Sequence, residues 1–323
     1  MRTGDATSTP PRNCCRLRLV AALGAALGAL AAAWPLAAVA SPCCSSVVAF
    51  GGSRLAAWER GAVGLQLGGR HELGWWDDAG RLHRLGPGIR QDAFSAELWG
   101  LAALSPSLQL SVALPWQVGL RSAPGVDAVG SAPGDVRFGL RAELVAIGAR
   151  PGWPGIAVVG SLVVPTGTRA EQAKAALGAD ASGRGAFRPG LGVVVEGAVG
   201  DAFWRGDLGL VVPAPFRRED RGGWQRDGVA LGLGATAGAQ FGTWVLSAMG
   251  RWQGEAAYHD GGAEVAGSER WISQLGVGVG LRLGPAWIVA ASVAGNPLGR
   301  VLGARNESEI WRAGLSVRRG ITD

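Results

Sequence analysis

Residues 134 to 144, GDVRFGLRAEL, place large apolar side chains and charged or small ones at alternate positions. Val136 and Phe138 stand on one side of this alternation, and Arg137 and Arg141 stand on the other. A period of two is typical of a β-strand whose two faces meet different surroundings. The stretch therefore predicts a strand, and it raises the question of which face is turned toward water.

The same alternation recurs along most of the chain. In residues 107 to 121, SLQLSVALPWQVGLR, every second side chain is apolar, and residues 270 to 283 repeat the pattern. Segments of this length suit a tilted crossing of a membrane, which takes about 9 to 11 residues per strand. The sequence predicts twelve strands, at about 62–73, 91–103, 107–120, 134–147, 155–165, 187–199, 203–213, 228–240, 243–254, 270–283, 286–295 and 309–319.

The connections between these segments alternate between two lengths. Short ones, such as Ser105-Pro106 and Gly284-Pro285, carry the Gly and Pro that tight turns use. Long ones fall at about 74–90, 121–133, 166–186, 214–227, 255–269 and 296–308. An even number of antiparallel strands, with short turns at one rim and long loops at the other, is typical of outer-membrane barrels. We therefore expect an all-β, transmembrane, up-and-down antiparallel β-barrel of about 12 strands, with both ends of the barrel chain on the side of the short turns.

The charged face of the strands is expected to line the barrel interior. In a membrane barrel the uniformly apolar face meets lipid, and the mixed face meets water and opposite charges in the lumen. Both signs of charge occur on that face, so part of the set could pair internally. The predicted lumen-lining residues are Arg70, Glu72, Glu97, Arg121, Asp135, Arg137, Arg141, Glu143, Glu196, Arg205, Asp207, Arg251, Arg282, Arg312 and Arg318.

The tryptophans favour a membrane barrel over a soluble sandwich. Aromatic residues form girdles at the two membrane interfaces of such barrels, whereas a soluble sandwich would bury them near the middle of its strands. The expected girdles are Trp153, Trp204, Trp244 and Trp287 beside the short turns, and Trp75, Trp76, Trp116, Trp224, Trp252, Trp271 and Trp311 near the long loops.

The first 40 residues have the features of a secretory signal peptide. Basic residues precede an apolar run from Leu19 to Ala33, and the small-residue site Ala38-Val39-Ala40 follows. The run is shorter than the roughly 20 residues of a helical membrane anchor, and Pro42 does not suit lipid attachment at the next residue. We therefore expect a signal peptide over 1–40, a periplasmic segment over 41–61, a barrel over 62–323 and location in an outer membrane.

The net charge and the cysteine content add little to this prediction of function. Loss of residues 1–40 removes four Arg and one Asp, which lowers the net charge from +6 to about +3. No run of basic residues suggests a nucleic-acid partner.

Cys43 and Cys44 are the two cysteines left after cleavage, and a role without catalysis is the expected one for this adjacent pair. Their chemistry stays open, because neighbouring cysteines can close a strained ring, cross-link to another molecule or hold a ligand.

A catalytic site has one weak candidate in the sequence. His259 could meet Asp77 or Asp78 above the barrel and activate a water between them, an arrangement that loosely resembles omptin-type proteases of outer membranes. Loops that contain Asp, Gly and Arg are, however, more often solvated hairpin tips. The sequence predicts no catalytic residue, no cofactor and no metal ligand.

Three segments resemble a known family. GDVRFGLRAEL (134–144), LVVPTGTR (162–169) and ALPWQVGLR (113–121) are similar to strand motifs of the outer-membrane barrel family named for the meta-pathway of phenol degradation. The resemblance covers about residues 90–200 and implies a transporter. The chain departs from many outer-membrane proteins in its last residues, RRGITD, which lack a final aromatic side chain.

Two functions follow from these observations. The first is a channel or transporter for small molecules, since a barrel of this size lies between filled small barrels and wide porins. The alternative is a structural or surface-interaction barrel that transports nothing, its lumen closed by Arg–carboxylate pairs, and a barrel hydrolase ranks third. Outer-membrane lipid and a small solute are the expected partners, while the identity of the solute and the oligomeric state are left open.

Overall fold

The computed structural model describes residues 54–150, 152–218, 223–296, 299 and 304–322. The predicted signal peptide, Cys43, Cys44 and most of the predicted periplasmic segment lie outside the described residues. The described chain belongs to one compact unit.

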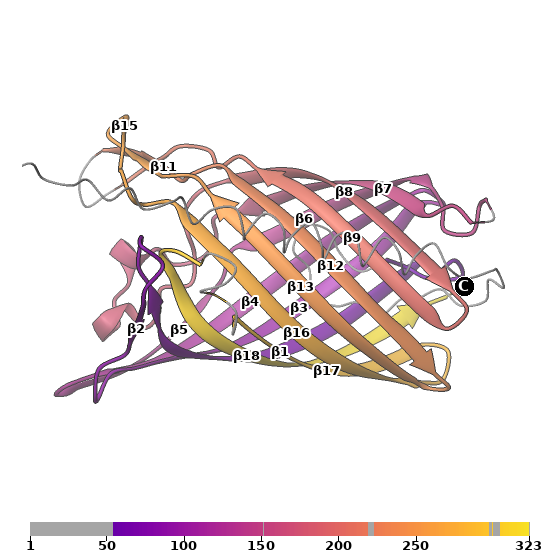
Figure 1. Ribbon diagram of the computed structural model, residues 1–323, viewed down its shortest axis with the longest axis horizontal. Coiled ribbons are helices and arrows are strands. Elements are labelled where there is room, and N and C mark those ends of the chain that lie inside the picture. The colour runs from indigo at the N-terminus through magenta and orange to yellow at the C-terminus, as the bar shows by residue number, and fades with distance from the viewer. Residues whose placement is uncertain (1–53, 151, 219–222, 297–298, 300–303, 323) are drawn as a thin grey trace, which may run out of the picture. The chain divides into compact units, whose positions relative to one another are not determined.

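Twelve antiparallel strands form the wall of a closed barrel (Figure 1). The last strand pairs with the first from Gly61 opposite Ile321 to Trp76 opposite Glu307, so the wall has no free edge. The twelve strands are β1 (Gly61–Trp76), β3 (Arg90–Ser105), β4 (Leu108–Ala123), β6 (Val136–Val145), β7 (Gly155–Val164), β8 (Arg188–Val199), β9 (Ala202–Val211), β12 (Ala230–Phe241), β13 (Trp244–Glu255), β16 (Arg270–Leu283), β17 (Trp287–Gly295) and β18 (Glu307–Ile321).

The predicted fold class and the twelve predicted strands are confirmed, and the connections differ in detail. Within the predicted loop 121–133, β5 (Val126–Pro133) forms a hairpin with the end of β4 through Gly125, whose φ is +80°. β4 therefore pairs with β6 in its first half and with β5 in its second. The two-residue turn Pro124-Gly125 is a clear turn signal in the sequence, but the small side chains of β5 hide the alternation that would have marked it as a strand.

The long loops carry additional local structure. The strands β10 (Phe216–Arg217), β11 (Trp224–Arg226), β14 (His259–Asp260) and β15 (Ala263–Glu264) form a second small sheet, and β2 (Leu82–Arg84) pairs with the end of β1. The short helical turns η1 (Ala170–Gln172) and η2 (Ala176–Gly178) lie in the loop between β7 and β8. Among the described residues, no helix is long and apolar enough to cross a membrane.

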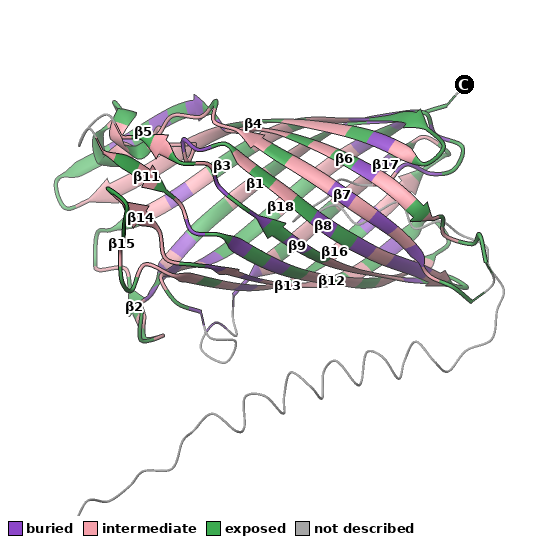
Figure 2. Cartoon of the chain, turned by 90° about the horizontal axis from the view of Figure 1, so that it is seen from above, coloured by how far each residue is buried: buried purple, intermediate pink, exposed green. Residues whose placement is uncertain are grey.

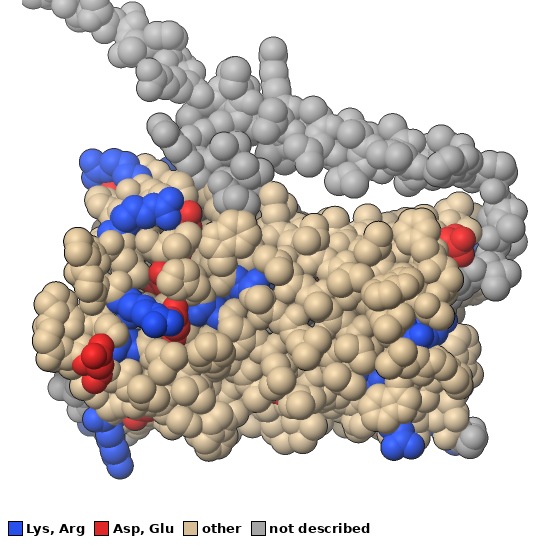
Figure 3. All heavy atoms as spheres, turned by 90° about the horizontal axis from the view of Figure 1, so that it is seen from below, with Lys and Arg blue, Asp and Glu red and all other residues tan. Residues whose placement is uncertain are grey.

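The outer face of the wall is apolar. Large hydrophobic side chains at alternate positions, such as Leu65, Leu67, Phe94 and Leu98, are about half exposed, and exposed and less exposed residues alternate along the strands in Figure 2. The face drawn in Figure 3 is almost uncharged over its middle, and its charged side chains gather toward the ends. So much exposed apolar area is unfavourable in water and matches the lipid-facing band of a membrane barrel.

Most of the predicted girdle tryptophans lie on the outer surface. Trp116, Trp153, Trp244 and Trp287 are between 44% and 59% exposed. Trp76 is an exception, because its indole is only 6% exposed and packs so closely on Gly299 that a Cβ there would lie 2.8 Å from it. The predicted interfacial position of Trp76 is therefore wrong.

Candidate functional site

A cavity of about 320 Å³ lies inside the barrel. Gln117 of β4 and Thr236 of β12 both line it, although four strands separate β4 from β12 along the wall. Further lining residues come from β1, β3, β9, β13 and the C-terminal strands. Only a space enclosed by the wall can be reached from opposite strands in this way, and we call it the central cavity.

The lining of the central cavity combines small and apolar residues with polar ones, and its charged residues are mostly arginines. Arg70, Arg251 and Arg312 line it, with Asp207 as the one carboxylate among its lining residues. Small side chains leave the space open. At Gly234, for example, a Cβ would lie 2.6 Å from both carboxylate oxygens of Asp207. The cavity thus depends on residues that occupy almost no volume.

Arg70 and Arg312 are direct cross-strand partners on β1 and β18. Both are exposed to the water-accessible interior, and no hydrogen bond or ion pair joins either guanidinium to another described residue. Arg251, across the cavity on β13, donates from Nη2 to Oε1 of Gln253 at 2.7 Å. The cavity wall therefore carries a concentrated positive charge.

On the side of the long loops, residues 166–186 contact the inner face of β4. We call this segment the inner loop. Nη1 of Arg121 donates to the carbonyl oxygen of Leu177 at 2.6 Å. A Cβ at Gly119 would lie 2.2 Å from the carbonyl oxygen of Ala179, so the glycine permits the close approach of the loop to β4. A smaller pocket lies between this part of the loop and Arg70.

Asp135 holds the inner loop at its two ends. One carboxylate oxygen accepts from the backbone N–H of Gly167 and the other from that of Arg184, each at 3.0 Å. The hydroxyl of Thr166 accepts from the N–H of Val136 and donates to the carbonyl of Gly134. The sequence predicts Asp135 only as a lumen-lining charge, whereas its carboxylate is committed to the loop backbone. Two of the segments that carry the family resemblance meet at this point.

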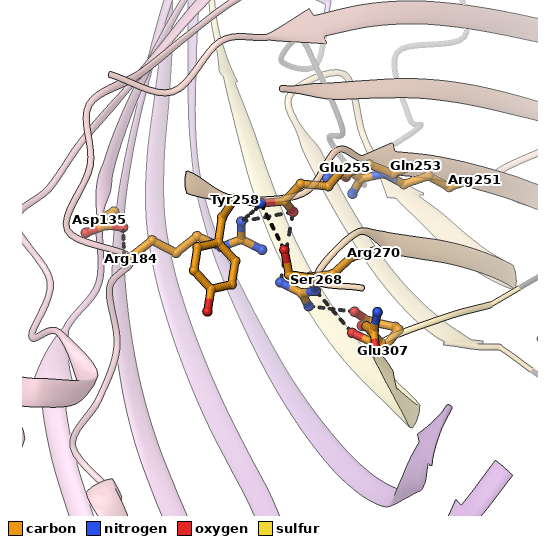
Figure 4. A network of polar contacts seen from close by, with 10 residues as sticks. Asp135, Arg184, Arg251, Gln253, Glu255, Tyr258, Ser268, Arg270 and Glu307 are labelled. Atoms are coloured by element: carbon orange, nitrogen blue, oxygen red, sulfur yellow. Dashed lines mark hydrogen bonds and ion pairs between the residues drawn. The ribbon is translucent and has the colours of Figure 1, made fainter. Parts of the chain in front are cut away.

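The inner loop is also tied to the opposite wall (Figure 4). Nη1 of Arg184 lies 2.8 Å from Oε1 of Glu255 at the end of β13. Glu255 also faces Arg270 at 4.0 Å, and Arg270 pairs with Glu307 at 2.6 Å. The loop thus crosses the mouth from β4 to β13, held by charges at both sides.

Two carboxyl groups near this mouth have shifted pKa values. Hydrogen bonds from the backbone N–H groups of Lys174 and Ala175 lower the pKa of Asp180 in the inner loop. Burial raises the pKa of Asp227, against the opposing effect of the Arg184 charge. Asp180 is therefore ionised at neutral pH and organises the turn that it caps.

On the side of the short turns, residues 54–60 lie inside the barrel. We call this stretch the N-terminal segment. Leu55 is 3% exposed and packs on Ala62, Leu101 and Trp99, and its N–H donates to Oε1 of Gln109 at 3.2 Å. The last residues of the segment predicted over 41–61 thus contact the wall, because the interior offers them apolar and charged partners.

Ion pairs attach both ends of the N-terminal segment to the wall. Nε of Arg54 lies 2.8 Å from Oε1 of Glu143 on β6 and 3.6 Å from Oε1 of Glu196 on β8. Both carboxylate oxygens of Glu59 accept from Arg318 on β18, one of them at 2.8 Å. About seven residues therefore contact β1, β3, β4, β6, β8 and β18, and they obstruct this end of the lumen.

The structure places the predicted lumen residues in three groups. Arg70, Arg251, Arg312 and Asp207 line the central cavity, and Arg121 and Asp135 hold the inner loop. Most of the others form ion pairs, which are Arg137 with Glu97, Arg141 with Glu196 and Glu143, Arg205 with Asp207 at 3.9 Å, and Arg318 with Glu59. Two remain outside these pairs: Glu72 is buried on β1, and Arg282 lies opposite Ile288.

Sequence reasoning missed several charged partners. Arg54, Glu59 and Arg184 lie outside the predicted strands, so the alternation that selects lumen residues does not apply to them. Glu255 and Arg270 stand opposite each other at the ends of β13 and β16. Both residues lie at the open ends of two neighbouring predicted strands, and this position is the sequence feature that could have indicated their contact.

The candidate catalytic residues do not converge. Asp77 binds Arg81 and His83 of its own loop, the latter at 2.9 Å, and these hydrogen bonds keep the pKa of Asp77 well below its usual range. His259 lies in the small sheet opposite Arg226. Within the described residues no contact joins it to Asp77 or Asp78, and no group of three His, Cys, Asp or Glu side chains could hold a metal ion.

The fold and the cavity together define a β-barrel of the outer-membrane type with three arginines in the lining of its interior cavity. The fold is similar to that of an outer membrane channel from Pseudomonas putida F1, with a TM-score of 0.65 and 11% identity over 82% of this chain and 98% of that one. The translocator domain of the autotransporter NalP from Neisseria meningitidis has a TM-score of 0.47 at 11% identity, over 94% and 97% of the two chains. The NanC porin has a TM-score of 0.45 at 9% identity, over 79% and 98%.

No family model matches the sequence, and no curated protein sequence matches it. The similarity to the channel from Pseudomonas putida F1, at this identity, shows a shared fold. The resemblance to the family named for the phenol meta-pathway stays a prediction from the three sequence motifs.

Proposed function

We propose that the protein is a channel for small polar solutes in an outer membrane. The observation that carries this proposal is the central cavity, which is enclosed by the wall, open enough for a small molecule and lined in part by charged and amide side chains. A lumen surface of this kind sets selectivity by width and charge. The apolar outer face supports membrane insertion, and the resemblance to a family of transporters supports the same role.

Two elements narrow the proposed path. The inner loop contacts β4 on the side of the long loops, and the N-terminal segment obstructs the side of the short turns. A solute that crosses the barrel must pass both. We therefore expect a small conductance, set by these two elements more than by the diameter of the twelve-stranded wall.

One set of observations favours the alternative of a barrel that transports nothing. Arg–carboxylate pairs fill part of the lumen, including Arg141 with Glu196 and Glu59 with Arg318, and the side chains of these residues are less than about a tenth exposed. These pairs cluster toward the short turns, however, and leave the central cavity open. The alternative requires that the N-terminal segment never leaves its place.

Reconstitution separates the two functions. The refolded protein, verified by its different migration on gels with and without heating, is inserted into planar bilayers and into liposomes loaded with a small sugar. Discrete conductance steps and liposome swelling support a channel. A folded, inserted barrel that gives neither current nor swelling, even after removal of residues 54–60, supports the structural barrel and overturns the proposal.

A further inference from the structure

We infer that the central cavity is a binding site for a small organic carboxylate, held by Arg70 and Arg312. This inference rests on the proposed channel, because it names the class of solute that the channel would select. It starts from the pairing of two arginines that the barrel closure brings together.

Two like charges placed directly opposite each other on neighbouring strands destabilise a sheet. Arg70 and Arg312 stand in this relation, and no described carboxylate forms an ion pair with either. Several other lumen arginines are paired with carboxylates, as Arg137 is with Glu97 and Arg318 is with Glu59. Arg70 and Arg312 lie at the cavity, where a ligand could supply the missing negative charge.

The other charges near the cavity do not neutralise this pair. The carboxylate of Glu307 is taken by Arg270 at 2.6 Å. Asp207 lies across the cavity, 3.9 Å from the guanidinium of Arg205, while Arg251 adds a third positive charge to the lining. The cavity therefore attracts an anion and repels a cation.

The chemistry of the lining favours a carboxylate with a small organic body. Guanidinium groups bind carboxylates through parallel N–H···O hydrogen bonds in a planar fork. Gln66 and Gln117 add neutral amide donors and acceptors, and Met249 adds an apolar surface. A volume of about 320 Å³ is at the lower end of the range typical of small-molecule sites.

Two measurements on the full barrel test the inference. Benzoate binding is followed by calorimetry on the folded protein in detergent, with benzyl alcohol as the uncharged comparison. The ratio of anion to cation permeability is taken from the reversal potential across a potassium chloride gradient. We expect benzoate to bind, benzyl alcohol to bind at least tenfold more weakly, and chloride to pass more readily than potassium.

The variants are Arg70→Gln, Arg312→Gln and the double variant. Loss of the charge-assisted hydrogen bonds from one guanidinium should weaken benzoate binding about tenfold, the double variant should weaken it further, and each variant should lower the ratio of anion to cation permeability. Arg319→Gln is the matched control: it removes the same charge from β18, where Arg319 instead lies over the Trp287 ring, and it should change neither value. Heat-modified gel migration shows that each variant is folded.

The outcomes separate the inference from the proposed function. Binding without conductance would overturn the channel and keep the carboxylate site. Conductance without benzoate binding, or equal binding of benzyl alcohol, would overturn the site and keep the channel. Unchanged affinity in a folded double variant would overturn the assignment to Arg70 and Arg312.

Discussion

The ion pair between Glu59 and Arg318 should control whether the N-terminal segment stays inside the barrel. Their side chains are 3% and 8% exposed, and both carboxylate oxygens accept hydrogen bonds. Glu59→Gln removes the charge and keeps the size. The variant leaves the guanidinium of Arg318 in the lumen with no opposite charge on the segment.

Loss of this ion pair is expected to remove a large part of the free energy that keeps the N-terminal segment inside the barrel. Breaking one partner of a buried ion pair costs about 3 to 5 kcal/mol, and we take about 3 kcal/mol because lumen water can reach the freed guanidinium. The loss corresponds to about a 100-fold shift toward the released segment.

Two assays report this shift. In detergent, trypsin should cleave after Arg54 far faster in Glu59→Gln than in the wild type, because the docked Arg54 is bound to Glu143. In planar bilayers, the variant should show larger conductance steps or longer dwell times at high conductance. Glu264→Gln, in the exposed β15 strand, is the control and should behave as the wild type.

Two results would contradict this role of the ion pair. Cleavage after Arg54 at the wild-type rate would show that the ion pair does not hold the segment. Fast cleavage with unchanged conductance would show that the segment leaves but does not limit the path.

Three further predictions concern the loop and the arginine pair. Asp135→Ala removes two backbone hydrogen bonds and should destabilise the docked inner loop (166–186) by about 1 to 3 kcal/mol, seen as faster proteolysis within it and no change in barrel melting. The pKa of Asp180 is lowered from its usual 3.8. Ionised Asp180 therefore stabilises the inner loop fully above pH 3.8, and this stabilisation is lost as the pH falls through the pKa of the folded state. Conductance should change over that acidic range, and Asp180→Asn should abolish the change. Arg312→Gln relieves repulsion with Arg70 and should raise the unfolding free energy by about 0.2 to 1 kcal/mol, measured by urea titration in detergent; a fall would contradict the like-charge argument.

Alternation alone predicted the wall of the barrel well. The strands at 270–283 and 155–165 match β16 and β7 to within about a residue, because strand geometry sends successive side chains to opposite faces whatever the neighbouring strand is. The same rule failed for β5, whose small side chains carry little contrast, and it could not apply to the inner loop.

The candidate site was less predictable than the wall. The sequence selected Arg70 and Arg312 as lumen residues, but they are 242 positions apart by the numbering, and nothing local indicates that they are partners. Trp76 has the sequence context of an interface residue, yet Gly299 covers it. Such contacts depend on which segments fold inward.

The sequence by itself determined that this chain forms an antiparallel barrel with an apolar and a charged face, since a period of two is a local property of the backbone. The tertiary structure decided which charges neutralise one another and which do not. Closure of β1 on β18 sets the register that opposes Arg70 and Arg312, and the entry of the N-terminal segment and the inner loop into the lumen supplies partners to Arg318 and Arg121. Electrostatic pairing depends on distance through space, and only the closed barrel defines that distance.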